Sequence, residues 1–209
     1  MSLSLTNYIK RAHAAFPPLA AYAYPWQATT QAAALVGEWL RTLGDGYRIH
    51  NGIAVHRTAT VEEGVVLKGP VVVGAGCFLA AHAYLRGGVF LDEGITLGPG
   101  CEVKSSFVFQ GATLAHFNFV GDSLVGAGVN LEAGAVVANH YNERAHKDIT
   151  VRAAGQLIPT GVQKFGALIG DGSRLGANAV TSPGTILEPG SVVGRLELVE
   201  QVKLTPPYS

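Results

Sequence analysis

The sequence has few of the residues that mark several common classes of protein. Only two cysteines, Cys77 and Cys101, occur in 209 residues, far too few for a disulfide-bonded scaffold. Charged residues make up 14% of the chain and the formal net charge is zero, which argues against a nucleic-acid-binding protein or a disordered acidic tail. No apolar run reaches the roughly 18 residues that cross a bilayer. We therefore expect a soluble protein of the cytoplasm.

Apolar residues, by contrast, are abundant and regularly spaced. Hydrophobic residues make up 48% of the chain, and 27 residues are glycine. Large apolar residues recur at every sixth position, namely Val55, Val61, Leu67, Val73, Leu79, Leu85, Leu91, Leu97, Val103 and Phe109. A period of six is typical of a solenoid in which each unit is a short strand and a turn, and three units close a triangular coil. The sequence therefore predicts an all-β fold, a parallel β-helix over residues 51–197, with the large residues inside.

Two interruptions of the repeat are candidate functional loops, because loops on a rigid scaffold commonly carry function. The register stops after Phe109 and resumes at Val125, so we expect the chain to leave the solenoid in between, in a loop that contains His116. The second interruption spans 139–166 and is rich in charge.

The remaining segments lie outside the repeat. Residues 1–50 are predicted to be helical, most clearly across 29–43, and to form an N-terminal cap or arm, while 198–209 form a C-terminal tail. Cys77 and Cys101 are 24 positions apart, which is one coil plus one wall. We therefore expect them to lie on different walls and not to pair.

The repeat places three cations together. Lys68, Arg86 and Lys104 each follow an inward-pointing residue and are spaced by one coil, so they form an outward column. Like charges about 5 Å apart repel by roughly 1 kcal/mol in water, which favours an anion between them. Two alternatives are that the three are solvated surface charges and that Glu102 neutralises part of the column.

His116 is a candidate general base, because an imidazole has a pKa near neutrality and accepts a proton from an attacking amine or hydroxyl. A loop histidine is also commonly a surface residue. A zinc site of three histidines is a rival hypothesis, since some proteins with six-residue repeats resemble zinc-dependent carbonic anhydrases. Neither His82 with His116 nor His140 with His146 has the required spacing, so we expect no metal.

The stretch 86–139 resembles a known family, the acetyltransferase domain of bifunctional glucosamine-1-phosphate acetyltransferase/N-acetylglucosamine-1-phosphate uridyltransferases. The matching residues are Arg86, Lys104 in EVK, His116 in AH, Asn130 in GVN and Asn139 in AN, at steps of 18, 12, 14 and 9. The later segment TGVQKFGALIGDGSRLGANAVTSPGT is similar to archaeal-type sugar-1-phosphate nucleotidylyltransferase/acetyltransferases. The resemblance covers about 85–195. It implies a left-handed β-helix of hexapeptide repeats.

The resemblance also implies roles for individual residues. His116 would be the general base, Arg86 and Lys104 would bind the sugar phosphate, Asn130 would contact the sugar, Asn139 would position the amine or thioester, and the backbone of Ala177 would meet the pantetheine of acetyl-CoA. It further implies a homotrimer with sites between chains.

The chain departs from the family at several positions. Phe119 stands where the family has a tyrosine that contacts the phosphate, and His140 replaces a tyrosine after Asn139. The next lysine of the family, on the cofactor side, falls on either Lys147 or Lys164. No Gly-rich phosphate loop of a nucleotidyltransferase follows a first strand, so we expect no uridyl transfer.

These observations predict an acetyl-CoA-dependent N-acetyltransferase acting on an amino-sugar 1-phosphate or a related sugar nucleotide. One alternative is a non-catalytic protein that binds sugar phosphates or sugar nucleotides, which the change to Phe119 favours. Another is a structural β-helix scaffold, for which the irregular loops would have no purpose.

Overall fold

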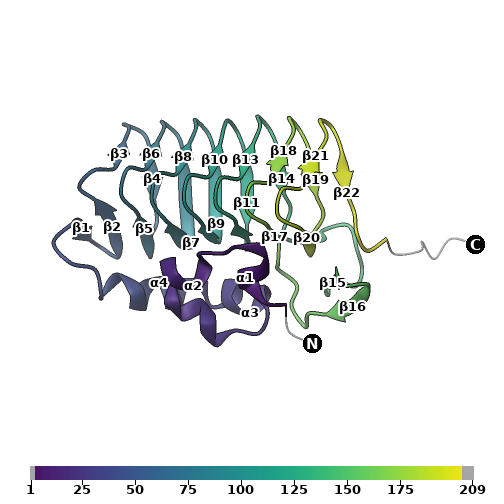
Figure 1. Ribbon diagram of the computed structural model, residues 1–209. Helices are drawn as coiled ribbons and strands as arrows, with labels where there is room; N and C mark the ends of the chain where they lie inside the picture. The colour runs from purple at the N-terminus through teal and green to yellow at the C-terminus, as the bar shows by residue number, and fades with distance from the viewer. Residues whose placement is uncertain (1–2, 204–209) are drawn as a thin grey trace, which may run out of the picture.

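The computed structural model describes residues 3–203 and shows a parallel β-solenoid of about eight turns (Figure 1). Each coil contributes three short strands, and equivalent strands of successive coils pair in parallel. The predicted β-helix of six-residue repeats is therefore confirmed.

The strands form three walls. Wall 1 contains β4 (Val66–Leu67), the first part of β7 (Tyr84–Leu91), the first part of β9 (Glu102–Val108), β11 (Phe119–Gly121), β14 (Val136–Val137), β19 (Val180–Thr181) and β22 (Leu198–Val199). Wall 2 contains β2 (Ile53–His56), β5 (Val71–Val73), the second parts of β7 and β9, β12 (Leu124–Val125), β17 (Ala167–Ile169) and β20 (Thr185–Leu187). Wall 3 contains β3 (Thr60–Val61), β6 (Phe78–Leu79), β8 (Thr96–Leu97), β10 (Thr113–Leu114), β13 (Asn130–Leu131), β18 (Arg174–Leu175) and β21 (Val192–Val193).

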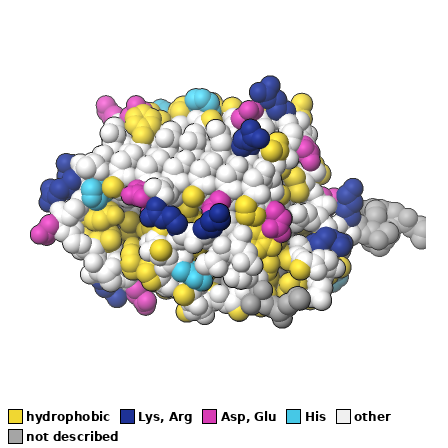
Figure 2. All heavy atoms as spheres, viewed as in Figure 1, with side chains coloured by type: hydrophobic (Ala, Val, Ile, Leu, Met, Phe, Trp, Pro, Cys, Tyr) yellow, Lys and Arg dark blue, Asp and Glu magenta, His cyan; other side chains and the backbone are white. Residues whose placement is uncertain are grey.

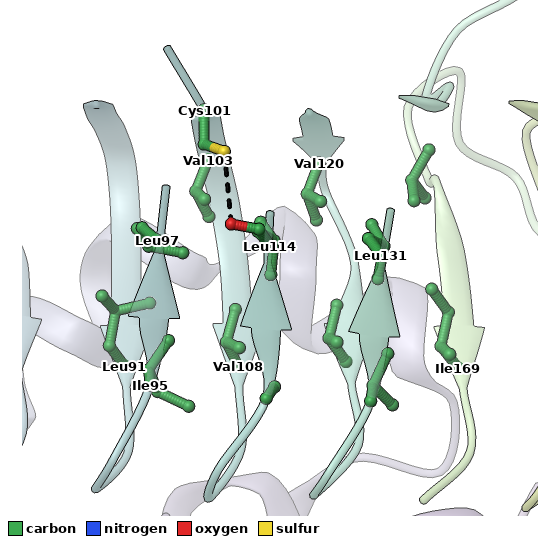
Figure 3. Packing of buried hydrophobic residues seen from close by; sticks show 14 of the residues in the cluster. Leu91, Ile95, Leu97, Cys101, Val103, Val108, Leu114, Val120, Leu131 and Ile169 are labelled. Carbon is green, nitrogen blue, oxygen red and sulfur yellow. Dashed lines mark hydrogen bonds between the residues drawn. The ribbon is translucent and has the colours of Figure 1, made fainter. Parts of the chain in front are cut away.

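The core of the prism consists of the inward side chains stacked from coil to coil. Leu97, Leu114 and Leu131 occupy paired positions on successive strands and are buried (Figure 3). Full burial of a leucine stabilises a fold by about 1.5–3 kcal/mol. Val61 is an exception to the predicted core, with 37% of its surface exposed, because it belongs to the first coil and has neighbours on one side only. Cys77 and Cys101 are free and buried, and they precede strands of different walls, β6 and β9, as predicted.

The prediction for Phe109 was wrong. The step from Val103 to the next inward residue is five positions long, so Val108 fills the prism and Phe109 points outward. The segment after it does not leave the solenoid, because the repeat continues through Leu114 and Val120 with a second five-residue step to Val125. The two five-residue steps therefore shifted the sequence pattern and made this segment look like a loop.

The second interruption, 139–166, is confirmed as an excursion from the solenoid. The chain leaves after β14, forms an antiparallel hairpin of β15 (Thr150–Ala153) and β16 (Gln156–Pro159), and returns at β17. It leaves at the corner between walls 1 and 2, which we call the loop edge. We call the corner between walls 3 and 1, which holds His116, the histidine edge.

The predicted N-terminal helices are present and cover the outer face of wall 2 (Figure 1). They are α1 (Leu5–Tyr8), α2 (Ala12–Ala15), the 3-10 helix η1 (Pro17–Ala21), α3 (Pro25–Thr30) and α4 (Ala32–Leu40). The ring of Phe16 lies 4.8 Å from that of Phe90 and 5.1 Å from that of Phe107. Both sides of wall 2 are thus buried, which explains its continuous apolar runs such as Val71–Val73. The helical prediction was wrong for Tyr47–His50, which form strand β1, antiparallel to β2.

The close approach of α4 to the solenoid depends on Gly88. Its φ is +90°, and a Cβ atom there would lie 2.3 Å from the backbone nitrogen of Ala33 in α4. The absence of a side chain thus allows α4 to lie directly on the corner that follows Arg86.

We expect Gly88→Ala to lower the free energy of unfolding by about 2–4 kcal/mol, because the clash with α4 adds to the strain of the left-handed conformation. Urea denaturation would measure this change. Gly76→Ala is the matched control, since Gly76 has a φ of +65° but nothing within 4 Å of the added Cβ, and should cost about 1 kcal/mol. Equal losses in both variants would contradict the proposed contact.

Candidate active site

The cation column lies on wall 1, at the loop edge. Arg86 and Lys104 are paired in register on β7 and β9, as predicted. Arg86 is not a bare charge, because its Nη2 lies 2.7 Å from Glu102 Oε1 and its Nε donates to the same oxygen at 2.8 Å. Its guanidinium and the ammonium of Lys68 both lie over the ring of Tyr84. The alternative that Glu102 neutralises part of the column is therefore confirmed.

Lys104 is held by a carboxylate that the sequence analysis missed. Its Nζ lies 2.6 Å from Asp122 Oδ2, and the side chain of Asp122 is only 8% exposed. The amide Nδ2 of Asn139 donates to the same oxygen. The only sequence signal for Asp122 is its place between Gly121 and Ser123. This stretch lies one coil after the two serines that follow Lys104. Figure 2 shows a face of the molecule on which Lys and Arg side chains lie near Asp and Glu side chains.

The amide of Asn139 has a defined orientation as a consequence. Because Nδ2 donates to Asp122, the oxygen Oδ1 is the atom that Asn139 has free to accept a hydrogen bond from a ligand. The backbone carbonyl of Asn139 accepts from the N–H of Phe165 at 3.1 Å, which joins the two ends of the 139–166 excursion. Gly121 leaves the room for this arrangement, since a Cβ there would meet Asn139 at 2.5 Å and Phe119 at 2.8 Å.

His116 lies at the opposite side of wall 1, on the histidine edge. It is exposed, and its side chain has no hydrogen bond or ion pair to the described residues. Its backbone carbonyl accepts from the N–H of Gly134 at 2.8 Å, and the carbonyl of Ala133 accepts from Asn178 at 2.9 Å. His116, Ala133 and Ala177 therefore stack along one edge. Phe119 lies between the two edges, on the wall itself.

The backbone N–H of Ala177 already has a partner. It donates to Glu132 Oε2 at 2.9 Å, and the same oxygen lies 3.1 Å from Arg195 Nε. These two donors, Arg195 first, lower the pKa of Glu132 below its usual value. A cofactor that hydrogen-bonds to Ala177 must therefore displace Glu132.

Asn130 is not brought to wall 1. It lies on wall 3, is exposed, and lines a groove of about 310 Å³ with Glu132, Arg174 and Arg195. Within one chain it does not join Arg86 and Lys104.

The two candidate lysines of the 139–166 excursion differ in position. Lys164 is exposed and lines a hollow of about 510 Å³ at the loop edge, together with Asp122. Lys147 is half-buried and lies outside that hollow.

No group of three His, Cys, Asp or Glu side chains within residues 3–203 is placed to hold a metal ion. Over the same residues, every helix lacks the length and apolar character needed to span a membrane.

Comparison with known proteins gives the family. The chain is 32% identical over 163 residues to a bifunctional sugar-1-phosphate nucleotidylyltransferase/acetyltransferase of Sulfurisphaera tokodaii, covering 75% of this chain and 40% of that protein. It is 35% identical over 144 residues to the bifunctional protein GlmU of Nitratidesulfovibrio vulgaris, covering 64% and 31%. The chain thus spans well under half the length of these two relatives. No family profile matches it.

A third relative matches over most of its own length. The uncharacterized acetyltransferase YaiX of Escherichia coli strain 536 is 31% identical over 157 residues, which covers 75% of this chain and 67% of that protein. With the solenoid of six-residue repeats, this match places the chain in a defined class. The chain belongs to the hexapeptide-repeat acetyltransferases.

We expect Asp122→Asn to lower the free energy of unfolding by about 1.5–3 kcal/mol, since it removes the charge that Lys104 and Asn139 share while keeping the shape of the side chain. Urea denaturation would measure the loss. Asp45→Asn, at an exposed position, should change stability by less than about 0.5 kcal/mol. An Asp122→Asn protein as stable as the wild type would mean that the pair contributes nothing to the fold.

Proposed function

We propose that this protein is an acetyl-CoA-dependent N-acetyltransferase whose acceptor is an amino sugar with a phosphate at C1. The main support is the distribution of residues across wall 1. Arg86, Lys104 and Asn139 lie at the loop edge and His116 at the histidine edge, at the spacing that resembles the sugar-phosphate acetyltransferases. A strand of three residues spans about 10 Å, so one sugar phosphate has the right length to reach from one edge to the other.

The chemistry is direct transfer. His116 takes a proton from the sugar amine as the nitrogen attacks the thioester carbon, and a backbone N–H at a coil corner stabilises the oxyanion. When the intermediate collapses, the carbon–sulfur bond breaks and His116 returns the proton to the departing thiolate. The products are the N-acetylated sugar phosphate and free coenzyme A.

The orientation of Asn139 supports this scheme. Its free Oδ1 lies at the phosphate end of wall 1, so in this scheme it accepts a hydrogen bond from a hydroxyl of the sugar and holds the ring with its amine toward His116. Arg86 retains N–H groups that Glu102 does not use, and these bind the phosphate.

A homotrimer would complete the site. Large apolar side chains stand exposed around the histidine edge, including Phe117 at 71% and Leu196 at 78%. Such surfaces are typical of subunit contacts. A second subunit whose wall 3 faces this wall 1 would bring its own Asn130 to the acceptor. The acetyl-CoA would lie along the histidine edge, next to Ala177.

We expect the enzyme in the cytoplasm.

A non-catalytic protein that binds sugar phosphates is the second candidate. It is favoured by Phe119, which lacks a hydroxyl for the phosphate, and by the absence of a described residue that orients the His116 ring. An acetyl-transfer assay with glucosamine 1-phosphate and with nucleoside-diphosphate glucosamines distinguishes the two candidates.

His116→Ala should lower the turnover number at least about 100-fold, because the general base is lost. The melting temperature should stay unchanged, because the exposed side chain of His116 does not pack in the core. Steady-state acetyl transfer would measure this effect. His146→Ala, an exposed histidine in the 139–166 excursion, is the matched control and should retain full activity. Wild-type turnover in the His116 variant would exclude this residue as the base.

Arg86→Gln should weaken binding of the phosphorylated acceptor by about 1.5–3 kcal/mol, the value of a hydrogen bond to a charged group, with little change for acetyl-CoA. Calorimetry would compare glucosamine 1-phosphate with glucosamine, which should bind poorly and equally to both proteins. Arg86 is a cleaner choice than Lys104, whose loss would leave the buried Asp122 without its ion pair. Unchanged affinity for the phosphorylated sugar would show that the column is surface charge only.

A further inference from the structure

The hollow at the loop edge begins one residue beyond the cation column. Its floor consists of Gly87, Ser105 and Asp122. Gly87 directly follows Arg86, and Ser105 directly follows Lys104. The order along the coil is therefore the histidine edge, then wall 1 with the cation column at its far end, and then the hollow.

The other sides of the hollow come from two segments distant in sequence. Thr29, Thr30 and Ala33 of the N-terminal helices form one side, and residues 162–164 at the end of the excursion form the other. A volume of about 510 Å³ falls in the range of small-molecule sites and exceeds what a phosphate group alone requires.

The groups in the hollow indicate its ligand. Lys164 is an exposed cation without an ion pair among the described residues, whereas Lys104 is already neutralised by Asp122. Among the described residues, the Oδ1 atom of Asp122 has no hydrogen bond. The Ser105 hydroxyl donates to the Gly87 carbonyl at 2.9 Å, and its oxygen can still accept a hydrogen bond. Val162 and Ala33 add apolar surface. The hollow thus offers a cation, acceptors for hydroxyl groups, and apolar surface for a flat ring.

We propose that the hollow binds the nucleoside part of a nucleoside-diphosphate amino sugar, so that the acceptor is a sugar nucleotide rather than a simple sugar 1-phosphate. This inference rests on the proposed function, which sets the sugar on wall 1 and its phosphate at the column. Any group attached to that phosphate then extends past the column. The second phosphate meets Lys164, the ribose hydroxyls donate to Asp122 and Ser105, and the base packs on Ala33 and Val162.

Two neighbouring alanines provide a matched test. Ala33 and Ala34 are both exposed on α4, but Ala33 lines the hollow and Ala34 does not. Leucine is a good helix former, so Ala33→Leu and Ala34→Leu should both fold, with equal melting temperatures. Only Ala33→Leu fills the hollow.

The first measurement is binding of UDP, GDP, CDP and dTDP by calorimetry, which does not depend on turnover. We expect at least one to bind the wild type and Ala34→Leu equally, and to bind Ala33→Leu at least about tenfold more weakly, as extra bulk in a fitted pocket requires. If none binds the wild type at millimolar concentration, or if the two variants bind alike, the proposal is overturned.

The second measurement compares acetylation of glucosamine 1-phosphate with that of the matching nucleoside-diphosphate glucosamine. The wild type should favour the nucleotide sugar at least about tenfold in kcat/KM, and Ala33→Leu should lose that preference. Equal use of both acceptors by the wild type overturns the hollow and leaves the acetyltransferase function standing. Nucleotide binding without acetylation of any amino sugar supports the hollow and overturns the function.

Discussion

The structure depends on the parallel pairing of short strands at equivalent positions in successive coils. This pairing brings each inward side chain into contact with those of the coils before and after it. Parallel strands pair about 4.8 Å apart, and this spacing fixes the vertical distance between equivalent residues. A residue at a given corner therefore has an equivalent one coil away, in a known direction. The cation column, the stacked alanines after His116, and the glycine positions all follow from this regular pairing.

The same regular pairing also determines where binding sites can form on the surface. Residues of the repeat alone line the groove on wall 3, whereas the larger hollow at the loop edge needs material from outside the repeat. The N-terminal helices and the 139–166 excursion supply it at one edge, where Gly88 lets α4 approach the corner. At the other edge no such cover exists within the described chain, and Phe117 and Leu196 are exposed there.

Much of this could be predicted from the sequence because a period of six leaves a strong signal. The column of Arg86 and Lys104 followed from counting, and its register is confirmed. Counting failed where the chain shortened a corner, as at Val108, because a five-residue step looks like a break in the pattern. Asp122 could not be identified, since its role arises from contacts with Lys104 and Asn139, which no spacing rule encodes.

All the irregular steps lie on one line of the molecule. The five-residue steps to Val108 and Val125 and the excursion of 139–166 all occur between wall 1 and wall 2, while the other two edges keep the step of six. Insertions and deletions at this edge leave every strand above and below in register. A change of chain length at this edge would therefore alter the surface beside the cation column and leave the edge that bears His116 in place.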